Sequence, residues 1–439
     1  MNNTVKEILE FVNENDIKFV RLFFCDLVGQ QKNVSIMSQE LERAFETGIS
    51  FDGSSITGFA DITNSDLLLF PDPATVSVLP WRPQQGRVIR FYCNIKNADG
   101  TSFICDARNL LKKVAKRSEQ MGFNCKIGTE CEFYLFKTDE NGVSSKNTHD
   151  NGGYFDVSPL DKGENIRREI CLCLEEMGIN PEASHHEEGP GQHEIDFRYS
   201  DVLQAADNFL SFKYAVKSIA ATNGLYASFM PKPFADKSGS GLHINLSLFQ
   251  NKNNIFNYEN VADSMAANSF IAGILEKGAE ITAFLNPVLN SYDRFGGFKA
   301  PGFLSWSHKN RSQFIRIPAA MGENMRIELR SPDAALNPYL AFAIILSAGL
   351  DGIEKKLELQ PPVDLDLYHI DETVKKELVP LPGSLKDAIA LAEESVFVRK
   401  IVGDEILDKY IHAKREEISE FEMAKSKETF CHERYFEVI

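Results

Sequence analysis

The chain has 439 residues, of which 43% are hydrophobic and 25% are charged, and its formal net charge is −16. This length exceeds the ~100–200 residues of a typical domain, so we expect two domains, one of them large. The acidic balance argues against nucleic acid or an anionic membrane as the main partner, because either would favour a basic face. It leaves room for phosphate ligands, which local arginines and a bound metal could accommodate.

The first hundred residues predict a small α+β unit. Their opening stretch lacks the basic-then-apolar plan of a signal peptide and predicts an amphipathic helix followed by a strand. Turn residues at 97–100 come before a helix opened by Asp106, so we expect a domain boundary between residues 1–102 and residues 103–439. Further strands are expected at 19–24, 31–36, 67–70 and 88–94, with a Gly/Ser loop at 51–55.

Beyond this boundary, strands alternate with helices, which are expected at 107–121, 165–177 and 205–221. The longest apolar segment, 339–350, is shorter than the ~20 residues needed to cross a bilayer and predicts a buried helix. The eight cysteines are scattered through these elements and are expected to be reduced core residues. Together these features predict a cytoplasmic protein without a membrane partner.

Four stretches of the larger part alternate polar and apolar residues, so that charged side chains fall on one face of a strand. Side chains two apart on a strand share a face. A single such strand usually turns its charges to water, but four of them predict polar faces turned toward one another. The polar positions are Glu130, Glu132, Glu194, His243, Arg326, Glu328 and Arg330.

This shared face predicts a divalent metal site. Acids held side by side repel each other unless a cation lies between them, and oxygen-rich ligands with one imidazole suit Mg²⁺ or Mn²⁺ better than zinc. Two loops each allow two interpretations. Residues 185–188 form a polar turn before the strand of Glu194, or a solvated hairpin loop. Residues 290–301 form a flexible loop over a ligand, or a plain surface connection.

Several ordered blocks carry a family resemblance. They are FDGSSITGFADITNSD at 51–66, SHHEEGPGQHEIDF at 184–197, KPFADKSGSGLHINLS at 232–247, NRSQFIRIP at 310–318 and MRIELRSPDAALNPYLAF at 325–342. With these blocks the chain resembles the glutamine synthetases of the bacterial class I type from end to end. The resemblance implies an α+β fold with a small N-terminal β-grasp-like domain. It also implies a large catalytic domain built on a curved antiparallel sheet with flanking helices.

The resemblance also implies an activity and an assembly. ATP would phosphorylate the γ-carboxylate of L-glutamate, and ammonia would then displace phosphate, with two or three Mg²⁺ or Mn²⁺ ions per active site. The chain would form a homo-oligomer, a dodecamer of two hexameric rings. Each active site would lie between subunits and be completed by the FDGSS loop of a neighbouring subunit.

Site residues follow from the resemblance by matching motif. The metal ligands would be Glu132, Glu187 and Glu194 for one ion, and Glu130, His243 and Glu328 for the second. The nucleotide and phosphoryl positions would be Arg311, Arg316 and Arg326, with Tyr199, Asn245 and Ser247 near the adenosine. The glutamate positions would be Arg294, Arg330 and the backbone of Gly239. The ammonium pocket would comprise Asp52 as proton acceptor, Ser54, Tyr154 and Glu187.

Three positions depart from the family pattern. Lys299 stands where the mobile loop normally carries a glutamate that shields the acyl phosphate, so it either pairs with Asp52 or turns outward while a neighbouring group acts as the lid. Ser238 replaces the usual asparagine beside the substrate α-carboxylate. Asp61 stands where a feedback-inhibited subtype has arginine. Tyr368 lies near a position that another subtype modifies, and we assign it no role.

The departures keep other functions open. The altered loop is compatible with a γ-glutamyl amine ligase that uses a polyamine or monoamine. A catalytically weakened regulatory paralogue is a second alternative, although the metal ligands are intact. From the clustered acids alone, a metal-dependent phosphoesterase would also be possible, but such a hydrolase needs no pocket for a second nucleophile.

Overall fold

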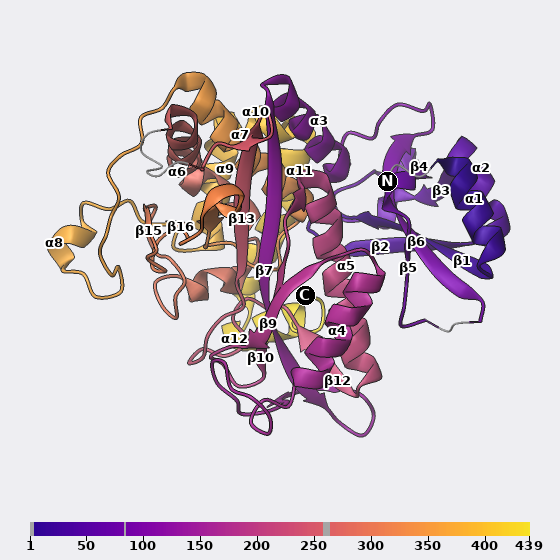
Figure 1. Ribbon diagram of the computed structural model, residues 1–439, viewed down its shortest axis with the longest axis horizontal. Helices are drawn as coiled ribbons and strands as arrows, with labels where there is room; N and C mark the ends of the chain where they lie inside the picture. The colour runs from indigo at the N-terminus through magenta and orange to yellow at the C-terminus, as the bar shows by residue number, and fades with distance from the viewer. Residues whose placement is uncertain (1–3, 83–84, 258–263) are drawn as a thin grey trace.

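The computed structural model describes residues 4–82, 85–257 and 264–439, and it contains two sheets that lie side by side along the longest axis (Figure 1). The smaller sheet contains the strands of the N-terminal part, and the larger sheet has most of the helices around it. The predicted α+β class, with a small unit followed by a large one, is confirmed. The exact boundary near residue 102 stays a prediction.

The N-terminal sheet has six strands in the order β2-β1-β6-β4-β3, with β5 paired to β6. β1 runs parallel to β6, while the other pairs are antiparallel. Helix α1 begins at a capping box in which Thr4 and Glu7 satisfy each other's backbone N–H groups. The elements are α1 Val5–Glu14, β1 Ile17–Cys25, β2 Gln31–Met37, α2 Leu41–Thr47, β3 Ile49–Asp52, β4 Asp66–Pro71, β5 Ser77–Val78 and β6 Arg87–Asn97.

The larger sheet is built around one long strand, β7, which pairs with β13 on one side and β10 on the other. Its main path is β15-β16-β17-β13-β7-β10-β9, and all of its pairs are antiparallel except β15 with β16. The strands are β7 Phe123–Thr138, β8 Ser144–Thr148, β9 Pro181–His186, β10 Gln192–Phe197, β11 Ser200–Asp201, β12 Leu225–Ser228, β13 Leu242–Gln250, β14 Asn253–Asn254, β15 Trp306–His308, β16 Ile315–Ile317 and β17 Ile327–Leu329.

The helices pack mainly against the larger sheet and against each other, and α3 and α5 contact β7 directly. No helix in the described ranges is long and apolar enough to cross a membrane. The helices are α3 Ala107–Gln120, α4 Glu164–Glu176, α5 Val202–Thr222, α6 Met265–Leu285, α7 Pro338–Lys355, α8 Glu372–Lys375, α9 Leu385–Glu394, α10 Val396–Val402, α11 Asp404–Met423 and α12 Lys427–Tyr435.

Helix α7 is the predicted buried helix. Asn337 caps it by accepting from the N–H groups of Tyr339 and Leu340, and Pro338 occupies its first position. It lies very close to α6, because a Cβ at Gly273 would come within 2.2 Å of the Ala348 carbonyl oxygen. The cysteines are free, and all except Cys171 and Cys173 are buried, as expected.

The two faces of β7 differ as the alternation predicted. Cys131, Phe133 and Leu135 are fully buried, and the ring of Phe133 lies 6.1 Å from that of Phe212 on α5. Glu130 and Glu132 project from the opposite face and are only partly buried. Burial of the apolar face fixes the register, since a one-residue slip would place the acids in the core. The core therefore determines where the acids point.

Two loop predictions need correction. Residues 185–188 do not form one turn, because His185 and His186 belong to β9 and only Glu187 begins the hairpin to β10. β9 lacks large apolar residues, so its sequence carried no strand pattern. Residues 290–301 are not flexible throughout either. Residues 289–294 form a 3-10 helix in which Tyr292 and Arg294 are buried, and the more exposed part of the segment is 295–299.

Candidate active site

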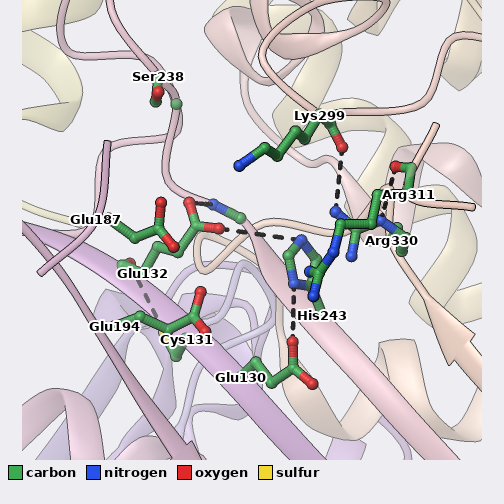
Figure 2. A network of polar contacts seen from close by, with 12 residues as sticks. Glu130, Cys131, Glu132, Glu187, Glu194, Ser238, His243, Lys299, Arg311 and Arg330 are labelled. Carbon is green, nitrogen blue, oxygen red and sulfur yellow. Dashed lines mark hydrogen bonds and ion pairs between the residues drawn. The ribbon is translucent and has the colours of Figure 1, made fainter. Parts of the chain in front are cut away.

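A cavity of about 520 Å³ opens on the polar face of the larger sheet. The cavity is lined by side chains from β7, β9, β10 and β13 and by residues of the 294–300 and 311–326 segments, which include Arg316 on β16. Figure 2 shows carboxylates gathered around His243, with Lys299, Arg311 and Arg330 across from them. The cavity thus brings together acids and bases that are far apart in the sequence.

Strand register places the acids. Glu132 on β7 lies directly opposite Glu194 on β10, and Glu130 lies opposite Asp196. On the other side of β7, Glu130 faces His243 of β13, and the His243 Nδ1 atom is 3.1 Å from the Glu130 carboxylate. Directly opposed residues in antiparallel strands have neighbouring side chains. The pairing alone therefore gathers four carboxylates and one imidazole.

Glu132 is held by neutral donors. The Gln192 side-chain amide and the Gly241 backbone N–H each donate to it at 3.0 Å. Its other oxygen lies 4.0 Å from His243 Nε2. Among the described residues no hydrogen bond reaches this oxygen, so it is available to a ligand.

Glu187 reaches the same place from the hairpin after β9. Its carboxylate lies 3.1 Å from His185 Nε2 and accepts from the backbone N–H of Glu188 at 3.0 Å. The buried Asp150 side chain holds both ends of this hairpin. Its carboxylate lies 2.9 Å from His186 Nε2 and accepts from the Gly191 N–H at 2.8 Å. His186 and Asp150 thus position Glu187 without lining the cavity.

The acids do not share one ionisation behaviour. Burial raises the pKa of Glu194 well above its usual range, and the carboxylates of Asp196 and Glu132 raise it further. Burial, with a smaller contribution from Glu130, raises the pKa of Asp196 to about 7. Burial also opposes ionisation of Glu130, but the hydrogen bond and charge of His243 lower its pKa to about 2. Burial and mutual repulsion thus favour the protonated form of Glu194 and Asp196, whereas Glu130 stays ionised beside His243.

The donor set fits hard divalent cations. Among the described residues, four groups have donor atoms within 4.8 Å of one another, and one of them, Asp150, His186 and His193, does not line the cavity. The other three are Glu130, His243 and Glu328; Glu132, Glu194 and His243; and His185, Glu187 and Glu194. Carboxylate oxygens with one or two imidazoles suit Mg²⁺ or Mn²⁺. The group of Glu130, His243 and Glu328 is one of the two predicted ligand sets. The members of the other predicted set, Glu132, Glu187 and Glu194, are divided between two groups that share Glu194.

Glu328 is fully buried between two arginines. It forms ion pairs with both Arg316 and Arg330. Arg330 also donates to the backbone carbonyls of Arg311 at 3.1 Å and Lys299 at 3.2 Å. Arg294 is 5% exposed and donates to the Ser331 carbonyl at 2.9 Å. These contacts fix the guanidinium groups before any ligand binds.

Gly239 and Gly241 make room for Arg294. A Cβ at Gly239 would lie 2.6 Å from the Arg294 Cγ atom and 2.5 Å from the Pro231 carbonyl oxygen. A Cβ at Gly241 would lie 2.8 Å from the Arg294 guanidinium. Glycine at both positions therefore leaves space for the buried Arg294 side chain beside the backbone that leads into β13.

Some predicted site residues do not line this cavity. Asp52 and Ser54 are on the N-terminal unit, where the Ser54 hydroxyl donates to Asp52 at 2.7 Å, and no described residue of that unit lines the cavity. Tyr199 is 47% exposed. Ser247 donates to the Met325 carbonyl at 3.1 Å. Asn245, two residues after His243 on β13, donates to Glu130 and accepts from Arg326.

Sequence reasoning gave no site role to three ionisable residues that line the cavity, Asp196, His185 and Glu188. Asp196 follows Glu194 by two positions on β10, so the alternation could have identified it. His185 and Glu188 stand on a strand end and hairpin without a pattern of their own. Within this chain, the Lys299 side chain lines the cavity 4.7 Å above the ring of Tyr154 and forms an ion pair with Glu188. Pairing of Lys299 with the Asp52 of a neighbouring subunit stays a prediction.

The chain matches known families over most of its length. Residues 104–432 match the glutamine synthetase catalytic domain, and residues 16–98 match the glutamine synthetase β-grasp domain. The glutamine synthetase of Clostridium saccharobutylicum is 45% identical over 423 residues, which cover 95% of this chain and 96% of that protein. The glutamine synthetase of Methanosarcina mazei is 46% identical, with 95% of each chain covered.

Solved structures agree with the sequence relatives. A GmaS/ADP complex has a TM-score of 0.87 and 30% identity and covers 97% of this chain and 98% of its own. Plasmodium falciparum glutamine synthetase has a TM-score of 0.86 and 27% identity over 99% of both chains. The N-terminal unit is thus a β-grasp domain, and the predicted family is confirmed. With both domain models matched and curated relatives above 40% identity, the chain belongs to the glutamine synthetase family.

Proposed function

We propose that the chain joins ammonia to the γ-carboxylate of L-glutamate at the expense of ATP, through a γ-glutamyl phosphate, and releases glutamine, ADP and phosphate. The observation that carries the proposal is the single cavity in which four opposed carboxylates and His243 face a set of arginines. The relatives named above favour this reaction over an amine ligase or a regulatory paralogue. We place the enzyme in the cytoplasm.

The arginines would bind the anionic substrates. Phosphoryl transfer depends mainly on positioning and on neutralising the charge of the phosphate oxygens. Arg311, Arg316 and Arg326 line the cavity and would hold the nucleotide phosphates and the transferred group. Arg294 and Arg330 would hold the glutamate carboxylates, with the Gly239 backbone beside them. Tyr199, Asn245 and Ser247 would lie toward the adenosine.

The carboxylates would hold two or three Mg²⁺ or Mn²⁺ ions. Glu130, His243 and Glu328 would hold one, and Glu132, Glu187 and Glu194 another. Bound cations would neutralise the acids and the phosphate oxygens. The Glu328 carboxylate already pairs with Arg316 and Arg330, so it would share its oxygens between the arginines and an ion.

Ammonium must lose a proton before it can attack, so the site needs a carboxylate base. Asp52 offers such a carboxylate, and the Ser54 hydroxyl and backbone N–H lower its pKa, so it stays ionised and attracts the ammonium cation. It stands exposed on the β-grasp domain, away from the cavity of its own chain. We infer that Asp52 and Ser54 complete the Tyr154 and Glu187 pocket of a neighbouring subunit. A closed ring, within a dodecamer of two hexameric rings, would supply every site in this way.

The first test is turnover by the purified chain. With ATP, Mg²⁺, L-glutamate and ammonium we expect one glutamine and one phosphate per ATP, measured by amino-acid chromatography and phosphate release. Omission of glutamate should abolish phosphate release. Release that continues without glutamate would instead indicate a phosphohydrolase, and release stimulated by an organic amine but not by ammonium would contradict ammonia as the nucleophile.

The shared site is tested by complementation. Asp52→Asn should lower kcat about 10²- to 10⁴-fold, as loss of a proton acceptor does. Glu132→Gln should inactivate the cavity of its own chain. Co-expression of the two variants should restore measurable glutamine synthesis, because some sites combine an intact cavity with an intact Asp52 loop. Glu132→Gln with Glu194→Gln damages the same cavity and serves as the negative control. Absence of recovery in the first pair would place Asp52 outside the site.

The metal hypothesis predicts that Glu194→Gln is at least as stable as the wild type without divalent cations and less stable than the wild type with them. Without divalent cations, Glu194→Gln should match or exceed the wild-type thermal midpoint, because it removes a buried acid beside Asp196 and Glu132. With Mg²⁺ or Mn²⁺ the wild type should gain about 2.7 kcal/mol at a hundred times Kd, and the variant much less. Differential scanning calorimetry measures both. The exposed Glu119→Gln should follow the wild type, and equal gains for Glu194→Gln would contradict the assignment.

A further inference from the structure

Two departures from the family pattern meet at a third side chain. The Lys299 ammonium group forms an ion pair with one carboxylate oxygen of Glu188. The Ser238 hydroxyl lies 3.5 Å from the other oxygen of Glu188, at the limit of a hydrogen bond. Glu188 directly follows the candidate metal ligand Glu187 and lines the cavity. Lys299 and Ser238, which look unrelated in the sequence, are thus partners of one carboxylate.

The backbone presents Lys299 to the cavity. Phe298 and Lys299 have φ angles of 47° and 64°, in the left-handed region that residues other than glycine rarely adopt. The Lys299 carbonyl accepts from Arg330 at 3.2 Å, and the Phe298 ring lies 4.2 Å from the Lys232 ammonium group. The segment 295–300 is therefore anchored on one side of the cavity while the Lys299 side chain reaches Glu188 on the other.

Charge at the cavity mouth follows from this pair. The Lys299 ammonium group lies 4.7 Å above the Tyr154 ring, in the pocket where we place ammonium. Two cations at one aromatic ring would repel each other, so Lys299 is compatible with ammonium only if a carboxylate neutralises it. Glu188 is the described residue that pairs with it. The carboxylate that neutralises Lys299 thus comes from the hairpin after β9.

We propose that Glu188 and Lys299 form a latch that closes segment 295–300 over the cavity and cancels the lysine charge beside the ammonium pocket. This inference rests on the proposed function. The two side chains are 35% and 42% exposed, so the pair is weak. A weak pair suits a segment that must open for substrates and close while the acyl phosphate is exposed to water. Glu188 and Lys299 are positioning residues, because neither is required to touch the reacting atoms.

The neutral variants Glu188→Gln and Lys299→Gln should have different effects on the KM for ammonium. Glu188→Gln leaves Lys299 unpaired and should raise the KM for ammonium about tenfold, the effect of an uncancelled charge a few ångströms away in a partly exposed site. Lys299→Gln leaves Glu188 unpaired and should lower that KM or leave it unchanged. Both variants break the latch, so both should form less glutamine per ATP hydrolysed. A purely structural role would shift KM in the same direction in both.

Charge exchange and a matched control complete the test. Lys299→Glu alone places two carboxylates together and should uncouple most strongly, while Lys299→Glu combined with Glu188→Lys should recover the glutamine-to-ATP ratio. Lys309→Glu is the control, because Lys309 is also a lysine at positive φ, 61°, but is exposed and does not line the cavity. It should behave as the wild type.

A second readout does not require turnover. Hydrogen exchange of the 295–300 amides, measured without substrates, should be faster in Glu188→Gln and Lys299→Gln and return toward the wild-type rate in the exchanged pair. The latch is overturned if an active wild type gives both single variants unchanged coupling and exchange, or if the exchanged pair fails to recover either. A wild type that forms no glutamine would instead refute the proposed function.

Discussion

Repulsion among carboxylates on one sheet face is the constraint on which the rest of this structure depends. Glu130, Glu132, Glu194 and Asp196 are opposed in pairs across β7 and β10, where Glu194 is buried and the other three are partly buried, so water screens their charges less than at the surface. Such an arrangement is tolerable only if protons or cations compensate it. The raised pKa values of Glu194 and Asp196 show the first solution, and bound divalent cations would be the second.

The surrounding structure holds these acids in place despite their repulsion. The apolar face of β7 packs against α5 and fixes the strand register. Asp150 and His186 fix the hairpin that carries Glu187, and Arg316 and Arg330 enclose Glu328. Each acid is therefore positioned by groups that do not need the ligand. This is the preorganisation that phosphoryl transfer requires, since charge must already be matched when the phosphate arrives.

Much of the cavity could be predicted from the sequence, because alternation reports which side chains share a face. That pattern identified Glu130, Glu132, Glu194 and His243 together, and the same pattern extended by two residues would have included Asp196. β9 could not be recognised in this way, since Pro181–His186 contains no apolar alternation. The buried 3-10 helix around Tyr292 was equally hidden, because its polar residues are buried by tertiary contacts that no local pattern records.

Contacts between segments that are distant in the sequence also could not be predicted from it. Lys299 and Ser238 could each be recognised as unusual, but only the folded chain brings both to Glu188. Asp52 is a similar case, because it is exposed on the β-grasp domain of its own chain and its proposed role requires another copy of the chain. Periodicity describes one element at a time, whereas these relations join elements or subunits.

The central claim is that this sheet face binds divalent cations between its carboxylates. Anomalous diffraction from crystals grown with Mn²⁺ tests it most directly. We predict at least two manganese peaks, one near Glu130 and His243 and one near Glu132 and Glu194. A well-ordered cavity without anomalous density at saturating Mn²⁺ would contradict the claim.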